Sequence, residues 1–161
     1  MKGPSMTIAA QEASDVRENV KSRRLLHPKK SSVKEYTAVY VIGALGYSLI
    51  EIIWRGNTHW TMTLTGGLCF TLIYVSNLKN RFKKLWKKCL MGSGIITSVE
   101  FSVGCLVNLG LKWNVWDYSA MHFNILGQIC LLYSGLWFLL CIPLCKLTGF
   151  LHKTFQEKFA A

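Results

Sequence analysis

Hydrophobic residues occur in four long blocks along this chain, not at the alternating spacing of a half-buried strand or soluble helix. The blocks cover residues 36–54, 59–78, 89–111 and 125–146, and basic or turn-forming residues separate them. Each block approaches the ~20 apolar residues that a helix needs to cross about 30 Å of hydrocarbon. The pattern therefore predicts an all-α, polytopic membrane protein, with a four-transmembrane-helix bundle over residues 36–149.

The two ends of the chain differ from these blocks. Residues 1–35 predict a basic tail, and no cleavage site for a signal peptide follows the first block. Residues 150–161 predict a short amphipathic tail, because Leu151, Phe155 and Phe159 recur every fourth residue. We expect both tails to lie in the cytoplasm, because of the distribution of Lys and Arg along the chain.

The positive charge is concentrated in alternate connections. The formal net charge of the 161 residues is +11, which in a soluble protein would suggest a nucleic-acid partner. Of the 19 Lys and Arg, eight precede residue 35, six lie in 79–88 and only two fall in the loops after the first and third blocks. The positive-inside rule then predicts cytoplasmic termini in a multi-pass protein of the cell membrane. We expect no nucleic-acid partner.

The loop from Lys79 to Lys88 predicts contact with lipid. Phe82, Leu85, Trp86 and Cys89 recur at steps of three and four residues with lysines between them, which suits a short helix in the headgroup layer. Each lysine would gain about 1 kcal/mol from anionic lipid. The alternative is a docking surface for a cytoplasmic partner.

Two acids interrupt the hydrophobic blocks. Glu51 lies near the end of the first block and Glu100 near the middle of the third, where a carboxylate costs about 3 kcal/mol and normally faces the interior of a bundle. Asn108 follows Glu100 on the same helical face. Small residues that permit close helix packing lie on nearly the opposite face, at Gly94, Ser98 and Ser102. We expect this small-residue stripe to face a neighbouring helix.

The loop before the fourth block supplies further polar groups, so the sequence predicts a polar pocket in the outer half of the bundle. Asn124 and Gln128 are one helical turn apart, and Trp116 and Tyr118 belong to an aromatic belt at the outer surface. The predicted ligand-binding residues are Glu51, Glu100, Asn108, Trp116, Asp117, Tyr118, Asn124 and Gln128.

Each acid also has a simpler interpretation. Glu51 could extend to the membrane interface, Glu100 could make a purely structural hydrogen bond, and Asp117 could anchor its loop. His59 and His122 have no spacing that supports a metal site with these acids. The sequence contains no nucleotide-binding loop, no Ser-His-Asp arrangement and no metalloprotease helix, so we expect no enzyme activity and no cofactor. Any ATPase would be a separate chain.

The segments "GY..IE..W" and "WDYS…N…GQICL…S..W", with the Glu100 helix between them, resemble the ABC-transporter type IV family of small bacterial membrane proteins. The resemblance covers roughly residues 38–142. It implies transport, and it departs from the family pattern at Met121-His122, where a proline is expected. By this resemblance, family-motif positions are occupied by Glu51, Glu100, Trp116, Asp117, Tyr118, Asn124, Gly127 and Gln128.

Two functions follow as hypotheses. The leading one is a permease-like or transport-associated membrane protein that acts as a homo-oligomer or with a separate ATPase subunit. The rival is a non-transporting membrane module, such as an immunity, sensor or assembly subunit that docks another membrane protein.

Overall fold

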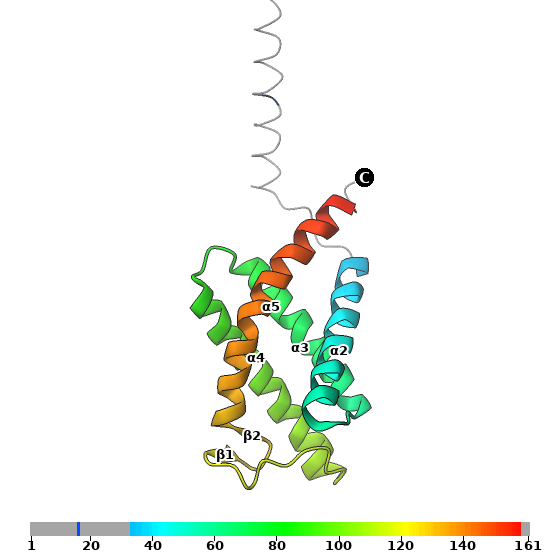
Figure 1. The fold of residues 1–161 in the computed structure, drawn as a ribbon, viewed down its shortest axis with the longest axis vertical. Helices are drawn as coiled ribbons and strands as arrows, with labels where there is room; N and C mark the ends of the chain where they lie inside the picture. Colours follow the sequence, from blue (N-terminus) through cyan, green and yellow to red (C-terminus); the bar gives the residue numbers. More distant parts are fainter. Residues whose placement is uncertain (1–15, 17–32, 159–161) are drawn as a thin grey trace, which may run out of the picture. The chain divides into compact units, whose positions relative to one another are not determined.

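Residues 33–158 form four long helices in the computed structural model, which describes Val16 and residues 33–158 (Figure 1). The helices are α2 (Val33–Arg55), α3 (Trp60–Lys79), α4 (Leu85–Gly104) and α5 (Leu131–Lys158). A π-helix (Cys105–Gly110) extends α4, and strands β1 (Asn124–Ile125) and β2 (Ile129–Cys130) form an antiparallel hairpin.

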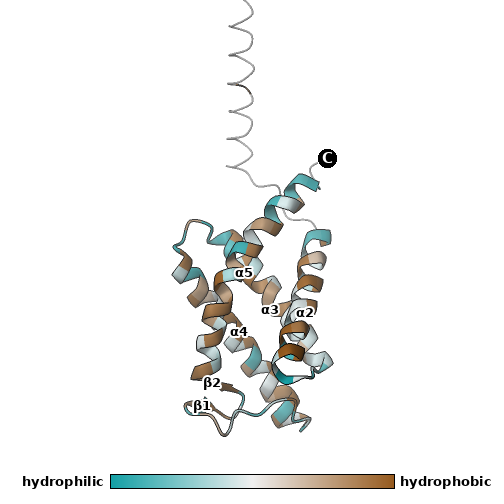
Figure 2. Ribbon diagram, viewed as in Figure 1, coloured by the Kyte–Doolittle hydropathy of each residue, from teal (hydrophilic) through white to brown (hydrophobic). Residues whose placement is uncertain are grey.

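All four helices are long and apolar enough to cross a membrane, counting the π-helix with α4. Figure 2 shows hydrophobic residues along most of their length and hydrophilic residues near several helix ends. The prediction of an all-α, multi-pass membrane protein is confirmed in these respects. Most of the predicted tail, residues 1–35, lies outside the described residues, but Val33 to Glu35 already belong to α2.

The fourth helix differs from its predicted block at both ends. It begins at Leu131 rather than residue 125, because residues 124–130 form the hairpin. Leu126 and Gly127 have φ values of 52° and 67°, which a right-handed helix cannot contain. At its other end α5 continues to Lys158, through the segment predicted as a separate amphipathic tail.

The helices pack as two pairs joined through α3. α2 packs along α3, α4 packs along α5, and α3 also contacts α4 and α5. Since the chain alternates direction, the start of α2, residues 80–84 and the end of α5 share one end of the bundle, here called the basic end. Residues 56–59 and 111–130 form the opposite end, here called the loop end.

Glycine permits the close approach of α2 and α3. A Cβ at Gly43 would overlap Phe70 Cβ and lie 3.0 Å from the Gly66 carbonyl oxygen, so neither helix could stay in place. One turn later, a Cβ at Gly46 would meet no atom within 4 Å.

We therefore expect Gly43→Ala to lower the thermal unfolding temperature, because overpacking a tight contact costs roughly 1–3 kcal/mol. Gly46→Ala is the matched control on the same helix. It should leave the unfolding temperature unchanged or raise it slightly, since alanine favours the helix. Equal effects of the two substitutions in detergent-solubilised protein would contradict this account of the α2–α3 contact.

The small-residue stripe at Gly94, Ser98 and Ser102 does not pack within the described bundle. All three residues are exposed, so the expectation that they face a neighbouring helix of the same chain is wrong. Gly92 makes the close contact of α4 instead, where a Cβ would lie 2.6 Å from Cys141 Sγ of α5. The correction follows from the orientation of α4, which turns Ser93 and Ile96 inward with Gly92.

Candidate functional site

The Glu100 cluster joins three helices inside the bundle. Glu100 of α4 is only 2% exposed. Trp137 of α5 donates its ring N–H to Glu100 Oε2 at 2.7 Å, and the Tyr47 hydroxyl of α2 donates to Oε1 at 3.3 Å. Both carboxylate oxygens are therefore hydrogen-bonded by aromatic side chains, as a buried acid in hydrocarbon requires. Tyr47, Glu100 and Trp137 are called the Glu100 cluster below.

A glycine in α3 allows Tyr47 to reach this position. A Cβ at Gly66 of α3 would overlap Tyr47 Cβ, so glycine lets the tyrosine pass close to the α3 backbone. The Tyr47 ring then lies 6.2 Å from the Trp137 ring, and Trp137 lies 6.4 Å from Tyr133. Tyr133 stacks on Tyr118 at 4.6 Å, so aromatic rings extend from the 111–130 loop to Glu100.

Glu51 lies one helical turn after Tyr47, towards the loop end. It is 7% exposed, so it does not reach solvent as an interfacial acid would. The Thr58 hydroxyl donates to Glu51 Oε2 at 2.5 Å, and Arg55 Nη2 lies 3.4 Å from Oε1. The same Arg55 nitrogen donates to the Val115 carbonyl at 3.2 Å. Glu51 thus holds the α2–α3 turn and, through Arg55, the long loop.

Asn108 in the π-helix organises the loop end. Its amide nitrogen donates to the Trp116 carbonyl at 3.0 Å and to Gln128 Oε1 at 2.8 Å, while its Oδ1 accepts from the Val115 N–H at 2.7 Å. Trp116 Nε1 in turn donates to the Gln128 carbonyl at 2.9 Å. A Cβ at Gly104 would lie 2.6 Å from Gln128 Oε1, so glycine makes room for this network.

The remaining predicted residues of the loop bond mainly to its backbone. Asp117 Oδ1 accepts from the Ser119 hydroxyl at 2.6 Å and from the Ser119 N–H at 2.8 Å, and these bonds hold the pKa of Asp117 below its usual range. Asn124 donates to the Met121 carbonyl and accepts from the Gly127 N–H. Burial raises the pKa of Tyr118, whose N–H donates to the Gly127 carbonyl.

The eight predicted ligand-binding residues therefore fall into two groups. Glu51 and Glu100 are buried acids in the helices, whereas the other six form or line the folded loop end. The contacts of Asp117 agree with the alternative prediction that this residue anchors its loop. Ligand binding by all eight residues stays a prediction.

Sequence reasoning missed Tyr47 and Trp137, which hold Glu100, and Thr58, which holds Glu51. A usable signal was present for Tyr47, because it lies four residues before Glu51 and hence on the same face of α2. His59 is explained by local structure: its Nδ1 accepts from the Thr61 N–H at 3.4 Å and caps α3.

A second buried polar cluster, also missed, lies at the basic end. Glu35 of α2 is 2% exposed and Tyr74 of α3 is fully buried. The Tyr74 hydroxyl donates to Glu35 Oε1, and His152 Nδ1 of α5 lies 3.1 Å from the same oxygen and 3.0 Å from the Tyr74 hydroxyl. Glu35, Tyr74 and His152 are called the Glu35 cluster. It ties the ends of three helices together.

Glu35→Ala should lower the free energy of unfolding by roughly 2 kcal/mol, because it leaves the buried Tyr74 hydroxyl without its acceptor. Glu157→Ala removes an exposed acid near the same end of α5 and is the control. Thermal unfolding of both variants measures the difference. A wild-type unfolding temperature for Glu35→Ala would show that the cluster does not contribute to stability.

Residues 36–160 match the family described as Putative ABC-transporter type IV. No curated protein and no solved structure matches this chain. The family match covers α2 to α5, with the Glu100 cluster and the whole loop end, and it agrees with the resemblance seen in the sequence motifs. The chain therefore belongs to the ABC-transporter type IV family.

Proposed function

We propose that this protein is a transport-associated membrane subunit whose working centre is the acid pair Glu51 and Glu100, in the half of the bundle nearer the loop end. The observation that carries the proposal is the burial of Glu100 among four membrane-length helices. An ionisable residue is costly in this environment and usually marks a path for an ion or a substrate.

The contacts of Glu100 also suggest how the centre would respond. α2 packs along α3 and has little backbone contact with α4 or α5, so the Tyr47–Glu100 bond is one of the few polar links between α2 and α4. A cationic or hydrogen-bond-donating group of a transported molecule would compete with Tyr47 and Trp137 for the carboxylate. Occupation of the centre would then loosen α2 from the α4–α5 pair.

Purification of the tagged protein from native membranes tests the proposal. We expect a nucleotide-binding subunit to copurify in fixed stoichiometry and to hydrolyse ATP. Glu100→Gln should retain that subunit but lose any increase in ATP hydrolysis caused by substrate. Copurification of one stoichiometric membrane partner without ATPase activity would instead support the rival function.

The rival, a module that docks another membrane protein, has one observation in its favour. Only Cys141 and Thr148 of α5 are buried, and one face of the helix carries exposed apolar residues such as Leu132, Leu136 and Leu139. This face is available to lipid or to another protein. A homo-oligomer would use the same surface.

We also propose that both termini lie in the cytoplasm of the cell, with the loop end outside. The support is the clustering of Lys and Arg at the basic end. Cysteine substitutions in a background without reactive cysteines test it: in intact cells, an impermeant reagent should label position 57 and leave position 84 unlabelled. Labelling of position 84 would show that the protein has the opposite orientation.

A further inference from the structure

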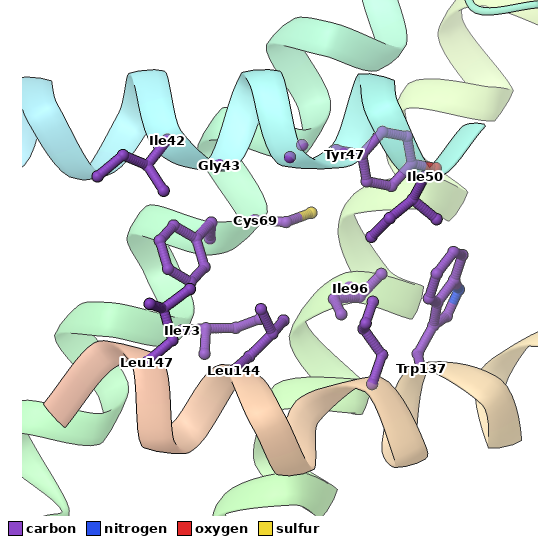
Figure 3. Close-up of a pocket in the computed structure, with 14 residues that line it drawn as sticks. Ile42, Gly43, Tyr47, Ile50, Cys69, Ile73, Ile96, Trp137, Leu144 and Leu147 are labelled. Carbon is purple, nitrogen blue, oxygen red and sulfur yellow. The ribbon is translucent and has the colours of Figure 1, made fainter. Parts of the chain in front are cut away.

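A cleft of about 130 Å³ separates the middle of α2 from the middle of α5 (Figure 3). Ile42 and Ile50 of α2 face Leu144 and Leu147 of α5, while α3 and α4 contribute residues such as Ile73 and Ile96 between them. The two outer helices have little direct backbone contact. The cleft is only partly enclosed, and the lining residues Ile42 and Ile50 are exposed, so in a bilayer the cleft would be accessible to lipid chains.

Polar bridges close the gap between α2 and α5 at both of its ends. At the basic end His152 of α5 contacts Glu35 of α2, and at the loop end Trp54 Nε1 donates to the Tyr133 hydroxyl at 3.4 Å. Between these bridges the lining is apolar. Hydrocarbon therefore suits the cleft better than water: an engineered apolar cavity of about 150 Å³ in another protein stays dry and binds benzene.

A shallow groove continues from the cleft towards the basic end. Ile42 lines both the cleft and this groove, which runs along α2 past Val41 to Lys34, with Phe155 of α5 beside it. Lys34 is exposed, and within residues 33–158 no acid forms an ion pair with it. A cation at the membrane interface attracts an anionic headgroup.

The lengths agree with one lipid chain. From Lys34 to Gly46, twelve residues along α2 rise about 18 Å at 1.5 Å per residue. Half of a hydrocarbon core of about 30 Å is roughly 15 Å, so an acyl chain whose headgroup lies at Lys34 reaches the near part of the cleft.

We propose that the cleft and groove bind one anionic phospholipid, with an acyl chain between α2 and α5 and the headgroup at Lys34. This site is separate from the polar pocket and does not depend on the proposed transport function. Bound lipid would fill the space that helix packing leaves between α2 and α5. The rings of Tyr47 and Trp137, whose polar atoms hold Glu100, line the far part of the same cleft.

Photo-crosslinking in vesicles of phosphatidylcholine and phosphatidylglycerol tests the site. The probe is phosphatidylglycerol with a diazirine near the end of one acyl chain, and adducts are mapped by peptide mass spectrometry. We expect enrichment on residues in the near part of the cleft, such as Ile42 and Leu144, relative to the exposed Leu90 of α4 and Leu106 of the π-helix. Labelling of all lipid-facing residues at equal frequency would overturn the proposal.

Two glycines provide a matched pair of variants. Gly46 lines the cleft and Gly94 lies on the outer face of α4, and a Cβ at either would meet no atom within 4 Å. Gly46→Leu should therefore fill the cleft and reduce its labelling several-fold, whereas Gly94→Leu should not. Leu140→Trp narrows the cleft from the α5 side, and it is the alternative blocking variant if Gly46→Leu does not fold. Unchanged cleft labelling in a folded blocking variant would overturn the proposal.

The headgroup is tested separately with phosphatidylcholine that carries the same diazirine chain. Lys34→Gln should reduce cleft labelling by the phosphatidylglycerol probe and leave labelling by the phosphatidylcholine probe unchanged. Equal labelling by both probes in the wild type would contradict the headgroup site. A photoreactive amino acid in place of Leu144 tests the alternative occupant: crosslinks between two protein copies would identify a second copy in the cleft and would also overturn the proposal.

Discussion

Glu100→Ala is expected to lower the free energy of unfolding by roughly 3 kcal/mol, among the largest effects of any single substitution in the bundle. The change removes the acceptor of both the Trp137 ring N–H and the Tyr47 hydroxyl. It also creates a cavity beside α5 and cuts a polar link between α2 and α4. Thermal unfolding in detergent, followed by circular dichroism, measures the loss.

Glu100→Gln separates structure from function at this position. The glutamine carbonyl can accept from Trp137, and its NH₂ group can donate to the Tyr47 hydroxyl, which then acts as acceptor. We therefore expect near-wild-type stability together with the loss of substrate-dependent activity. The double variant Glu100→Gln with Tyr47→Phe removes that acceptor and should be less stable than either single variant.

Two outcomes would contradict this account of Glu100. Wild-type stability of Glu100→Ala would show that its two hydrogen bonds do not hold the bundle together. Wild-type activity of Glu100→Gln would show that the ionisable group is not required, and Glu100 would then be a structural residue only.

Asn108→Ala is expected to have the second large effect, a loss of roughly 3 kcal/mol in the free energy of unfolding. The buried amide joins the π-helix to the backbone at residues 115 and 116 and to the side chain of Gln128. Its removal leaves several buried polar groups without partners, each at a cost of about 1–3 kcal/mol, of which relaxation and water recover a part.

Asn57→Ala is the control for this substitution. Asn57 lies in the short loop at the same end of the bundle, is exposed, and within residues 33–158 donates only to the Arg55 carbonyl. It should leave the unfolding temperature nearly unchanged. Hydrogen exchange of the backbone amides in residues 112–130 should rise in Asn108→Ala, and equal exchange in both variants would show that Asn108 does not organise the loop.

Local sequence signals predicted the helices well and the start of the fourth helix poorly. The first three blocks agree with α2, α3 and the combined α4 and π-helix to within a few residues, because uninterrupted hydrophobic length is sufficient to indicate a membrane helix. Ile125 to Cys130 is just as apolar as the blocks. Its hairpin depends on the turn at Leu126 and Gly127, and at Gly127 the atoms of Asp117 and Ser119 leave no space for a side chain.

The candidate site likewise has features that the sequence predicted and features that it did not. The position of Glu100 within a hydrophobic block was sufficient to predict its burial, since a carboxylate there must avoid lipid. Its partners were not predicted, because Tyr47 and Trp137 are 53 and 37 residues from it in the sequence and neither residue type by itself indicates a contact with a buried acid. The orientation of the small-residue stripe was wrong for a related reason: periodicity gives a helix two faces without saying which one meets a neighbour.

The sequence by itself determined that this protein crosses the membrane several times, and that an acid lies inside it. Both conclusions depend on the transfer of side chains from water to hydrocarbon, which is a property of short segments. Only the tertiary structure decided which residues hold Glu100, that Glu35 and His152 meet across the basic end, and that α2 and α5 leave a cleft between them. These features depend on helix crossing and rotation, which are set by packing among residues far apart in the chain.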